Sequence, residues 1–269
     1  MKNFDIYEFR KNLKTKYLGK DLIYFNSIDS TNDEAFKIAK ENTSNGTIIL
    51  AETQTSGRGR GDKKWLSPYG GLWFSIIIKP RISPLKISLI TLLSGLCVAE
   101  TIKGMLNLDA NIKWPNDVLI DNLKVAGILC ESEIIKNIIK YLVIGIGVNL
   151  NLDEEDLKSL DVKATSCKIE LKNEVNREEF LANLLQNLEN YYNKMLVPSE
   201  LKIMLNKIRK IIIPIGHDVE IKTEHKKFSG FAFNLADDGS LLVRIDKKVK
   251  TFTSSNIEYI RIKNINVSF

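Results

Sequence analysis

Up to Arg209, short apolar runs alternate along the chain with longer stretches whose apolar residues recur at helical spacing. The β-rich runs predict strands at 22–25, 47–51, 72–78, 118–120, 125–131 and 141–148. The run at 72–78 is apolar at nearly every position, which predicts a strand buried on both faces. Helices are predicted at 31–40, 87–105, 176–192 and 199–209, with a shorter one inside the charged segment 1–20. This mixture predicts an α+β fold.

Two of these helices carry a start signal. Thr31 with Glu34, and Asn176 with Glu179, have the spacing of a capping box, in which the two side chains bond backbone N–H groups of the first turn. We therefore expect Thr31 and Asn176 to begin their helices.

Beyond Ile213-Pro214 the pattern changes to short strands alone. They are predicted at 219–223, 228–235, 241–245, 250–252 and 259–262. Asp237-Asp238-Gly239 is a hairpin turn between two of them. Short strands at such close spacing predict a small β-barrel. We therefore expect two domains, 1–212 and 213–269.

Composition and charge narrow the class of protein only slightly. Hydrophobic residues make up 44% of the chain, so a sizeable core can be buried. The chain has 39 Lys and Arg against 33 Asp and Glu, a net charge of +6 that is spread along the sequence. So mild an excess suits an anionic ligand or an acidic partner and does not require a nucleic acid.

The cysteines and the N-terminus indicate the compartment. Cys97, Cys130 and Cys167 match no zinc or redox spacing, which predicts free, mostly buried thiols in a reducing cytoplasm. The first residues lack the apolar core of a signal peptide. The longest uncharged run, 87–99, is too short to span a bilayer. We expect a cytoplasmic protein with no membrane segment.

The segment from Gln54 to Trp65 carries the most informative chemistry, because it contains the run Gly57-Arg58-Gly59-Arg60-Gly61. Glycines let the backbone approach a ligand, and the arginines offer planar forks that match phosphate or carboxylate oxygens. The segment is typical of a mobile loop that closes over an anion. A solvated basic loop and an RNA-binding Arg-Gly patch are the alternatives.

Three later motifs add polar groups at strand ends. Lys113-Trp114-Pro115-Asn116-Asp117 is a turn whose side chains leave at fixed angles, or a plain turn that serves its own backbone. Lys124 begins an apolar strand, from which it projects over a site or simply into water. Gly145-Ile146-Gly147-Val148-Asn149 leaves one strand face bare for a flat ligand or for a packed helix.

Taken together and in this order, the motifs resemble the biotin protein ligase family. The resemblance is strong over residues 22–150 and weak in the last domain. It implies a catalytic domain related to class II aminoacyl-tRNA synthetases, followed by a small barrel that resembles a Src-homology 3 domain. It implies activation of biotin by ATP and magnesium as biotinyl-adenylate, and transfer to one lysine of a biotin carboxyl carrier protein or domain. A homodimer is left open.

The resemblance also implies a role for each motif residue. The residues expected to bind biotin are Ser30, Thr31, Asn32, Gln54, Arg58, Gly59, Arg60, Lys124, Gly127, Gly145 and Gly147. Those expected to bind ATP are Arg58, Arg60, Trp65, Lys113, Asn116, Asp117 and Asn149, with Asp117 also holding magnesium. The residues expected to be catalytic are Lys124, Arg58 and Lys113.

The sequence departs from the family pattern twice. Asp62-Lys63 stands where the family has another Gly-Arg pair, and Ser255-Asn256-Ile257 stands where it has Gly-Glu-Val. Both departures put a site contact in doubt. Few residues precede the first predicted strand, so we expect no helix-turn-helix domain, no repressor function and no specific DNA binding.

Two other functions compete with this interpretation. A lipoate or octanoate ligase or transferase shares the fold but needs an apolar tunnel, and the Gly-Arg loop with Trp114 to Asp117 favours biotin. A nucleic-acid binder would explain the arginines but not Lys113 or Lys124.

Overall fold

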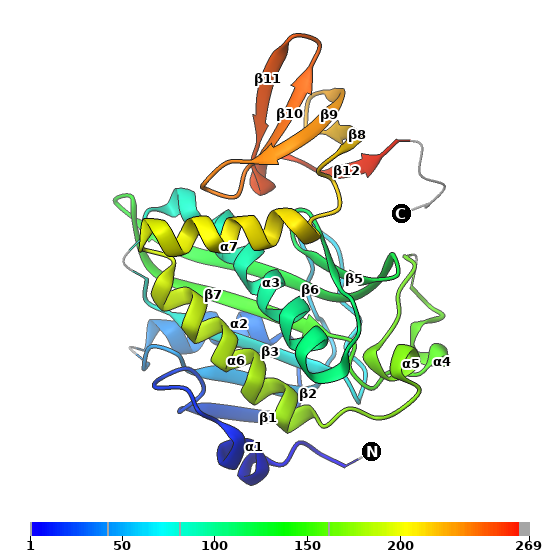
Figure 1. Ribbon diagram of the computed structural model, residues 1–269. Helices are drawn as coiled ribbons and strands as arrows, with labels where there is room; N and C mark the ends of the chain where they lie inside the picture. Colours follow the sequence, from blue (N-terminus) through cyan, green and yellow to red (C-terminus); the bar gives the residue numbers. More distant parts are fainter. Residues whose placement is uncertain (1, 42, 81, 161, 264–269) are drawn as a thin grey trace.

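A mixed seven-stranded sheet forms the centre of the computed structural model, which describes residues 2–41, 43–80, 82–160 and 162–263 (Figure 1). The strands lie in the order β1 (Leu22–Ile28), β2 (Ile48–Gln54), β3 (Leu72–Ile78), β7 (Ile138–Val148), β6 (Leu123–Ile135), β5 (Asp117–Ile120) and β4 (Asn111–Lys113). Among these seven strands, β1 and β2 pair in parallel, because helix α2 (Thr31–Lys40) carries the chain back between them, and the other neighbours pair antiparallel.

Helices cover both faces of this sheet (Figure 1). On one face, α3 (Ile87–Leu106) and α6 (Arg177–Lys194) pack against each other, with α1 (Ile6–Asn12) on α6 and α7 (Pro198–Ile211) on α3. On the other, α2 packs on β2, β3 and β7. Two short helices follow β7: α4 (Glu154–Leu157) and α5 (Cys167–Leu171). The strand residues alternate accordingly, since Ile48 and Leu50 join the large core while Ile49 joins the cluster under α2.

Helix α3 is long and mostly apolar. Among the described residues, Pro84–Leu106, which includes the 3-10 helix η1 (Pro84–Lys86), is the segment long and apolar enough to cross a membrane. The most apolar 18-residue window of this segment is 72% buried inside the protein. Its apolar character is therefore explained by its place in the core.

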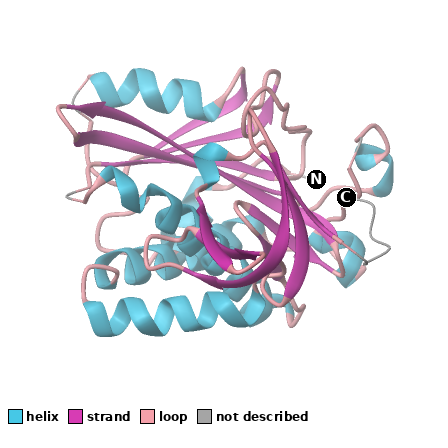
Figure 2. Ribbon diagram, turned by 90° about the horizontal axis from the view of Figure 1, so that it is seen from above, coloured by secondary structure: helices cyan, strands magenta, loops and turns pink. Residues whose placement is uncertain are grey.

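A second sheet follows α7 and packs on the main body. Its antiparallel strands lie in the order β11 (Lys248–Phe252), β10 (Leu241–Ile245), β9 (Lys227–Leu235), β8 (His217–Lys222) and β12 (Tyr259–Ile262), with the 3-10 helix η2 (Ser254–Asn256) before the last. The strands curl as they cross one another (Figure 2). The indole Nε1–H of Trp114 donates to the carbonyl oxygen of Gly239 at 3.1 Å, so the predicted hairpin turn docks on the first sheet.

Most predicted elements occur within a few residues of their expected ends, and Asn176 caps α6 by accepting from the Glu179 N–H. The predicted cap at Thr31 is wrong. Ser30 is the N-cap of α2, because its backbone is extended and its hydroxyl accepts from the Asp33 N–H. Thr31 is already helical, and its N–H donates to the side chain of Gln54. The sequence also missed β4, α4 and α5, which are too short to show periodicity.

A buried ion pair ties the N-terminal segment to the sheet. Arg177 donates to the carboxylate of Glu52 at 2.6 Å, and their side chains are 7% and 3% exposed. Burial alone would raise the pKa of Glu52, but hydrogen bonds from Arg177, the Phe4 N–H and the Tyr24 hydroxyl hold it below its ordinary value. The charged pair is therefore the stable state at neutral pH.

We predict that Arg177→Met lowers the free energy of unfolding by about 3–5 kcal/mol, because it leaves the Glu52 carboxylate buried and unpaired. Denaturant titration at pH 7 measures this. The double variant Arg177→Met/Glu52→Leu should recover most of the loss.

The same ion pair predicts a pH dependence. The pKa of Glu52 is lower in the folded than in the unfolded protein, so the stability that Glu52 contributes is present above its unfolded pKa. This contribution is lost as the pH falls through its folded pKa. Glu52→Gln should therefore flatten the acid limb of the stability curve, and an unchanged limb would contradict the assignment.

Candidate functional site

A cavity of about 380 Å³ lies beside β5, β6 and β7. The loop 58–66, residues 157, 160 and 162–164, and residues 258–261 at the second sheet complete its walls. The cavity is lined by all of the residues that the sequence assigns to the site: Ser30, Thr31, Asn32, Gln54, Arg58, Gly59, Arg60, Trp65, Lys113, Asn116, Asp117, Lys124, Gly127, Gly145, Gly147 and Asn149. The fold therefore brings the separate motifs to one place.

The glycines of β6 and β7 form a floor that the ring of Trp65 covers. Gly127 and Gly147 are paired across the two strands. A Cβ atom at Gly127 would lie 2.7 Å from the Trp65 ring, and one at Gly147 would lie 2.5 Å from the indole Nε1. Glycine is therefore required at both positions for the indole to lie on the sheet. At Gly145 the neighbour is Asn32, whose Oδ1 would lie 2.1 Å from a Cβ.

One end of the cavity is a wall of neutral hydrogen-bonding groups. The N–H and hydroxyl of Thr31 approach the Oε1 atom of Gln54 at 2.8 and 3.1 Å. The Nε2 atom of Gln54 donates to the Ser67 hydroxyl at 2.7 Å. The Ser75 hydroxyl lies 2.6 Å from the Asn32 Oδ1 and 2.8 Å from the Thr31 hydroxyl. This wall offers both donors and acceptors but carries no charge.

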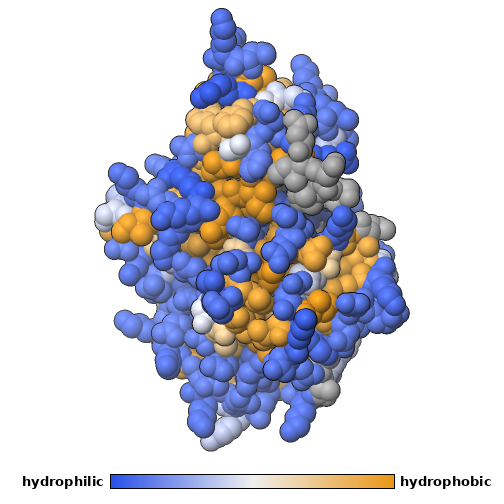
Figure 3. Space-filling model, turned by 45° about the vertical axis from the view of Figure 1, so that its right-hand side comes forward, coloured by the Kyte–Doolittle hydropathy of each residue, from blue (hydrophilic) through white to orange (hydrophobic). Residues whose placement is uncertain are grey.

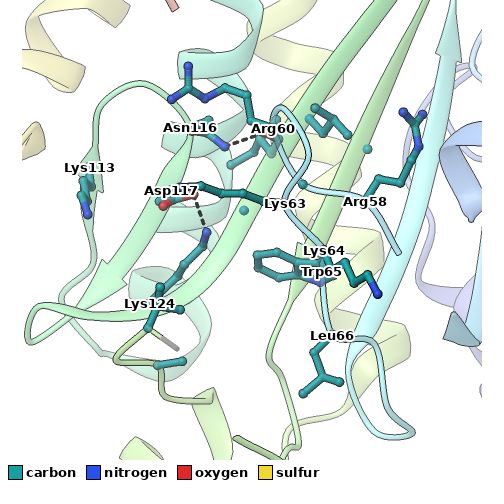
Figure 4. A pocket seen from close by; sticks show the side chains of 18 of the residues that line it. Arg58, Arg60, Lys63, Lys64, Trp65, Leu66, Lys113, Asn116, Asp117 and Lys124 are labelled. Atoms are coloured by element: carbon teal, nitrogen blue, oxygen red, sulfur yellow. Dashed lines mark hydrogen bonds and ion pairs between the residues drawn. The ribbon is translucent and has the colours of Figure 1, made fainter. Parts of the chain in front are cut away.

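The opposite end is cationic. The ammonium of Lys124 lies 2.7 Å from a carboxylate oxygen of Asp117 and 4.9 Å from the centre of the Trp65 ring (Figure 4). The register explains this meeting, since Lys124 pairs with Leu119, which lies two residues beyond Asp117 on β5 and so shares its face. Lys124 is therefore held over the floor by an ion pair and a ring contact, and does not simply extend into water.

Lys113 lies at the same end, on β4. Burial lowers the pKa of its ammonium; the charge of Asp117 opposes the shift, and the charges of Lys124 and Lys63 add to it. The ammonium groups of Lys113, Lys124 and Lys63 therefore lie close enough to repel one another, and the carboxylate of Asp117 offsets part of this repulsion. Such a cluster attracts an anion, because a bound negative charge would relieve the repulsion among them.

The Gly-Arg loop is folded back on itself as a narrow hairpin. The N–H of Gly59 donates to the Lys63 carbonyl at 2.7 Å, and the N–H of Trp65 donates to the Gly57 carbonyl at 2.8 Å. Arg58 points away from Lys124 on the far side of this loop (Figure 4). Its guanidinium lies 2.6 Å from Glu131 and 2.8 Å from Asp33, so it is held by two carboxylates.

Arg60 joins the loop to the second sheet. Its Nη1 atom donates to the carbonyls of Ser254 and Ile257 at 2.7 and 2.9 Å, and its Nη2 atom donates to that of Glu258 at 3.0 Å. The stretch Ser255-Asn256-Ile257, which departs from the family pattern, thus contributes one backbone oxygen, that of Ile257, and needs no particular side chain for this contact. Burial lowers the pKa of Arg60, and the charge of Asp117 opposes that shift.

Two predicted ligand residues bind the backbone in this structure. The Nδ2 atom of Asn116 donates to the Ile128 carbonyl at 3.1 Å, and that of Asn149 donates to the Thr165 carbonyl at 3.0 Å. Their amides therefore hold the strands and the segment after β7 together. This is the backbone-serving alternative that the sequence left open for the turn at Asn116.

Three parts of the site were not predicted from the sequence: residues 162–164, residues 258–261, and Glu131. None of them has a residue pattern that stands out, and only the fold brings them to the cavity.

On the face shown in Figure 3, apolar residues form a central band framed by hydrophilic ones.

Comparison with known proteins defines the class first. Residues 24–149 match the model of the Biotin/lipoate A/B protein ligase family. This range begins in β1 and ends just after β7, so it contains every residue predicted for the site.

Individual relatives are more specific. The chain is 32% identical to the bifunctional ligase/repressor BirA of Bacillus subtilis over 253 residues, 93% of this chain and 78% of that protein. It is 35% identical to the biotin–[acetyl-CoA-carboxylase] ligase of Paracoccus denitrificans over 158 residues, 57% and 65% of the two chains. The biotin protein ligase of Aquifex aeolicus, solved with biotin and ATP, superposes with a TM-score of 0.75 at 30% identity, covering 90% of this chain and 99% of that one. The chain belongs to the biotin protein ligase family.

We predict that Arg60→Ala frees the loop from the second sheet. The substitution removes the Arg60 guanidinium and its charge-assisted hydrogen bonds to the carbonyls, which are worth about 1.5–3 kcal/mol. The loop should therefore open about ten- to a hundredfold more often. A lysine-specific protease should then cleave at Lys63 or Lys64 faster by a similar factor. Arg10→Ala, on α1, is the matched control. Equal cleavage of Arg60→Ala and the parent would exclude the anchor.

Proposed function

We propose that the protein activates biotin with ATP as biotinyl-5′-adenylate and transfers it to a lysine of a biotin carboxyl carrier protein or domain. One observation carries the proposal: a single cavity is lined both by a neutral hydrogen-bonding wall and by a cationic end, with the ring of Trp65 on Gly127 and Gly147 between its strands and its loop. Biotin has the matching chemistry, with a neutral ureido head and a carboxylate tail. The wall at Thr31 and Gln54 takes the head, and the end at Lys124 takes the tail.

The first step joins two anions. A biotin carboxylate oxygen bonds to the α-phosphorus of ATP, and the bond from that phosphorus to the bridging oxygen breaks, so that pyrophosphate leaves. Fixed positive charges offset the repulsion between the reactants. Lys124 and Lys113 lie at the cavity end that suits this task. Arg58 is catalytic in this proposal only after it exchanges its carboxylate partners for substrate.

In the second step the carrier lysine amine attacks the acyl carbon, and AMP leaves with the anhydride oxygen. Water would destroy the anhydride, so the loop from Gly57 to Trp65 must cover it. Within the described residues, the buried indole N–H of Trp65 has no hydrogen-bond partner. A ligand acceptor would satisfy this donor, which supports a place for Trp65 in the ligand site.

Magnesium fits this site as an ion carried by the nucleotide. The described residues contain no group of His, Cys, Asp and Glu able to form a metal cage. Asp117 supplies one carboxylate, and magnesium is usually held by one or two carboxylates together with substrate phosphates. Asp117 would hold the ion, which would neutralise phosphate charge.

The finer architecture and the setting are also proposals. We propose that residues 1–212 form a catalytic domain related to class II aminoacyl-tRNA synthetases and that residues 213–269 form an SH3-like barrel. The separate second sheet supports this division. We further propose a cytoplasmic location, which the free cysteines Cys97, Cys130 and Cys167 support. Analytical ultracentrifugation would decide between a monomer and a homodimer.

Lipoate is the competing substrate, since the matching family model includes lipoate ligases. The Paracoccus denitrificans relative and the Aquifex aeolicus structure are both named for biotin, which supports biotin. Adenylate formation compared between biotin and lipoate separates the two.

We predict biotinylation of a carrier domain that depends on ATP and magnesium. The measurement is streptavidin detection after incubation, together with biotin-dependent release of pyrophosphate. A reaction without biotin and one with lipoate are the controls. Absence of both signals with several carrier domains would refute the proposed function.

We predict that Lys124→Ala slows single-turnover adenylate formation about a hundred- to a thousandfold, because one donor to a developing charge is worth about that much. Biotin affinity should fall less, since the polar wall is intact. Lys124→Arg should rescue poorly, because a fork replaces a point charge in a confined place. Lys103→Ala, which breaks a 3.0 Å surface pair with Asp109, is the matched control. A Lys124→Ala variant that melts normally and reacts within a few-fold of the parent would remove Lys124 from the reaction.

A further inference from the structure

Glu131 connects two parts of the site that are otherwise separate. It lies on β6, and its two carboxylate oxygens accept from Nη1 and Nη2 of Arg58 at 3.0 and 2.6 Å. The oxygen nearer Nη2 also accepts from the Nδ2 atom of Asn32 at 2.9 Å. One side chain therefore binds both the Gly-Arg loop and the neutral wall.

The contact with Asn32 sets the direction of the wall's hydrogen bonds. A carboxylate only accepts, so Asn32 must turn its Nδ2 toward Glu131 and its Oδ1 toward Ser75. The Ser75 hydroxyl has one proton, and Asn32 Oδ1, which lies 2.6 Å away, can only accept it. Asn32 and Ser75 are 4% and 0% exposed, so water cannot readily replace a lost partner.

The contact with Arg58 sets the position of the loop. Arg58 is bidentate on Glu131, the geometry in which an arginine–carboxylate pair is most directional. Asp33, on α2, adds a second carboxylate at 2.8 Å. The loop is therefore anchored on one side through Arg58 to β6 and α2, and on the other through Arg60 to the second sheet.

We propose that Glu131 is a positioning residue that couples the loop to the neutral wall, so that a ligand filling the wall also tightens the loop. For the identity of that ligand, biotin, the inference rests on the proposed function. The coupling itself depends only on the shared carboxylate. A surface ion pair without this link would contribute little to loop order, because the Arg58 and Glu131 side chains are 38% and 30% exposed.

The decisive variant is Glu131→Gln, which keeps the shape but offers one acceptor oxygen to two donors, Arg58 and Asn32. One contact is lost, and Asn32 can then reverse its amide. Glu131→Asp keeps the charge on a shorter arm and should rescue in part. Glu133→Gln is the matched control, because Glu133 lies two residues along the same strand, pairs with Lys140 and Tyr141, and is similarly exposed.

The experiment measures lysine-specific cleavage at Lys63 and Lys64 with and without biotin, and biotin affinity by calorimetry. We expect biotin to slow cleavage of the parent, of Glu133→Gln and, less strongly, of Glu131→Asp. For Glu131→Gln we expect about tenfold weaker biotin binding, faster cleavage without ligand, and little protection by biotin. Melting temperatures show whether each variant is folded.

The outcomes separate the two levels of inference. If Glu131→Gln binds biotin and protects the loop as the parent does, the coupling is refuted. If the parent does not bind biotin, the proposed function fails. Cleavage without ligand then still tests whether Glu131 anchors the loop through Arg58. Equal cleavage rates for Glu131→Gln and Glu133→Gln would overturn that anchor. A loss of affinity with full protection would also overturn the coupling, because it would show that the loop and the wall respond independently.

Discussion

The contact between Trp65 and the glycines of β6 and β7 is the constraint on which the site depends. The indole can lie on the sheet only because Gly127 and Gly147, paired across the two strands, present no side chains. With the ring in place, the loop that carries it passes over the cavity, and Lys124 gains a ring face beside its ion pair with Asp117. A side chain on either glycine would lift the loop and remove one wall of the cavity.

Charge is distributed around this floor so that Lys124, Arg58 and Arg60 have partners before any ligand binds. Lys124 is paired with Asp117, Arg58 with Glu131 and Asp33, and Arg60 with backbone carbonyls. Cations left unpaired in a closed cavity would repel one another. Anionic substrates would therefore bind by exchange of partners, which couples their arrival to a rearrangement of the loop.

The second sheet takes part in the site without supplying a recognisable motif. Its contribution to Arg60 is made by carbonyl oxygens of residues 254–258, and the turn at Gly239 docks through the indole of Trp114. Backbone acceptors are available whatever the side chains are, so a departure from the family pattern there leaves this contact intact. This explains why the resemblance is weakest in a region that still touches the site.

The sequence by itself predicted most of the strands, the main helices and many of the residues that line the cavity. Apolar periodicity is local, and the motifs carry their chemistry in a few adjacent residues, so both can be recognised along the chain. The tertiary structure alone decided the partners. From the sequence alone, Glu131 is an ordinary carboxylate on a strand and Thr31 is a candidate helix cap. The fold places Arg58 beside Glu131 and Gln54 beside Thr31, and these contacts define their roles. Such contacts join residues that are distant in sequence, and no local pattern records a distance in space.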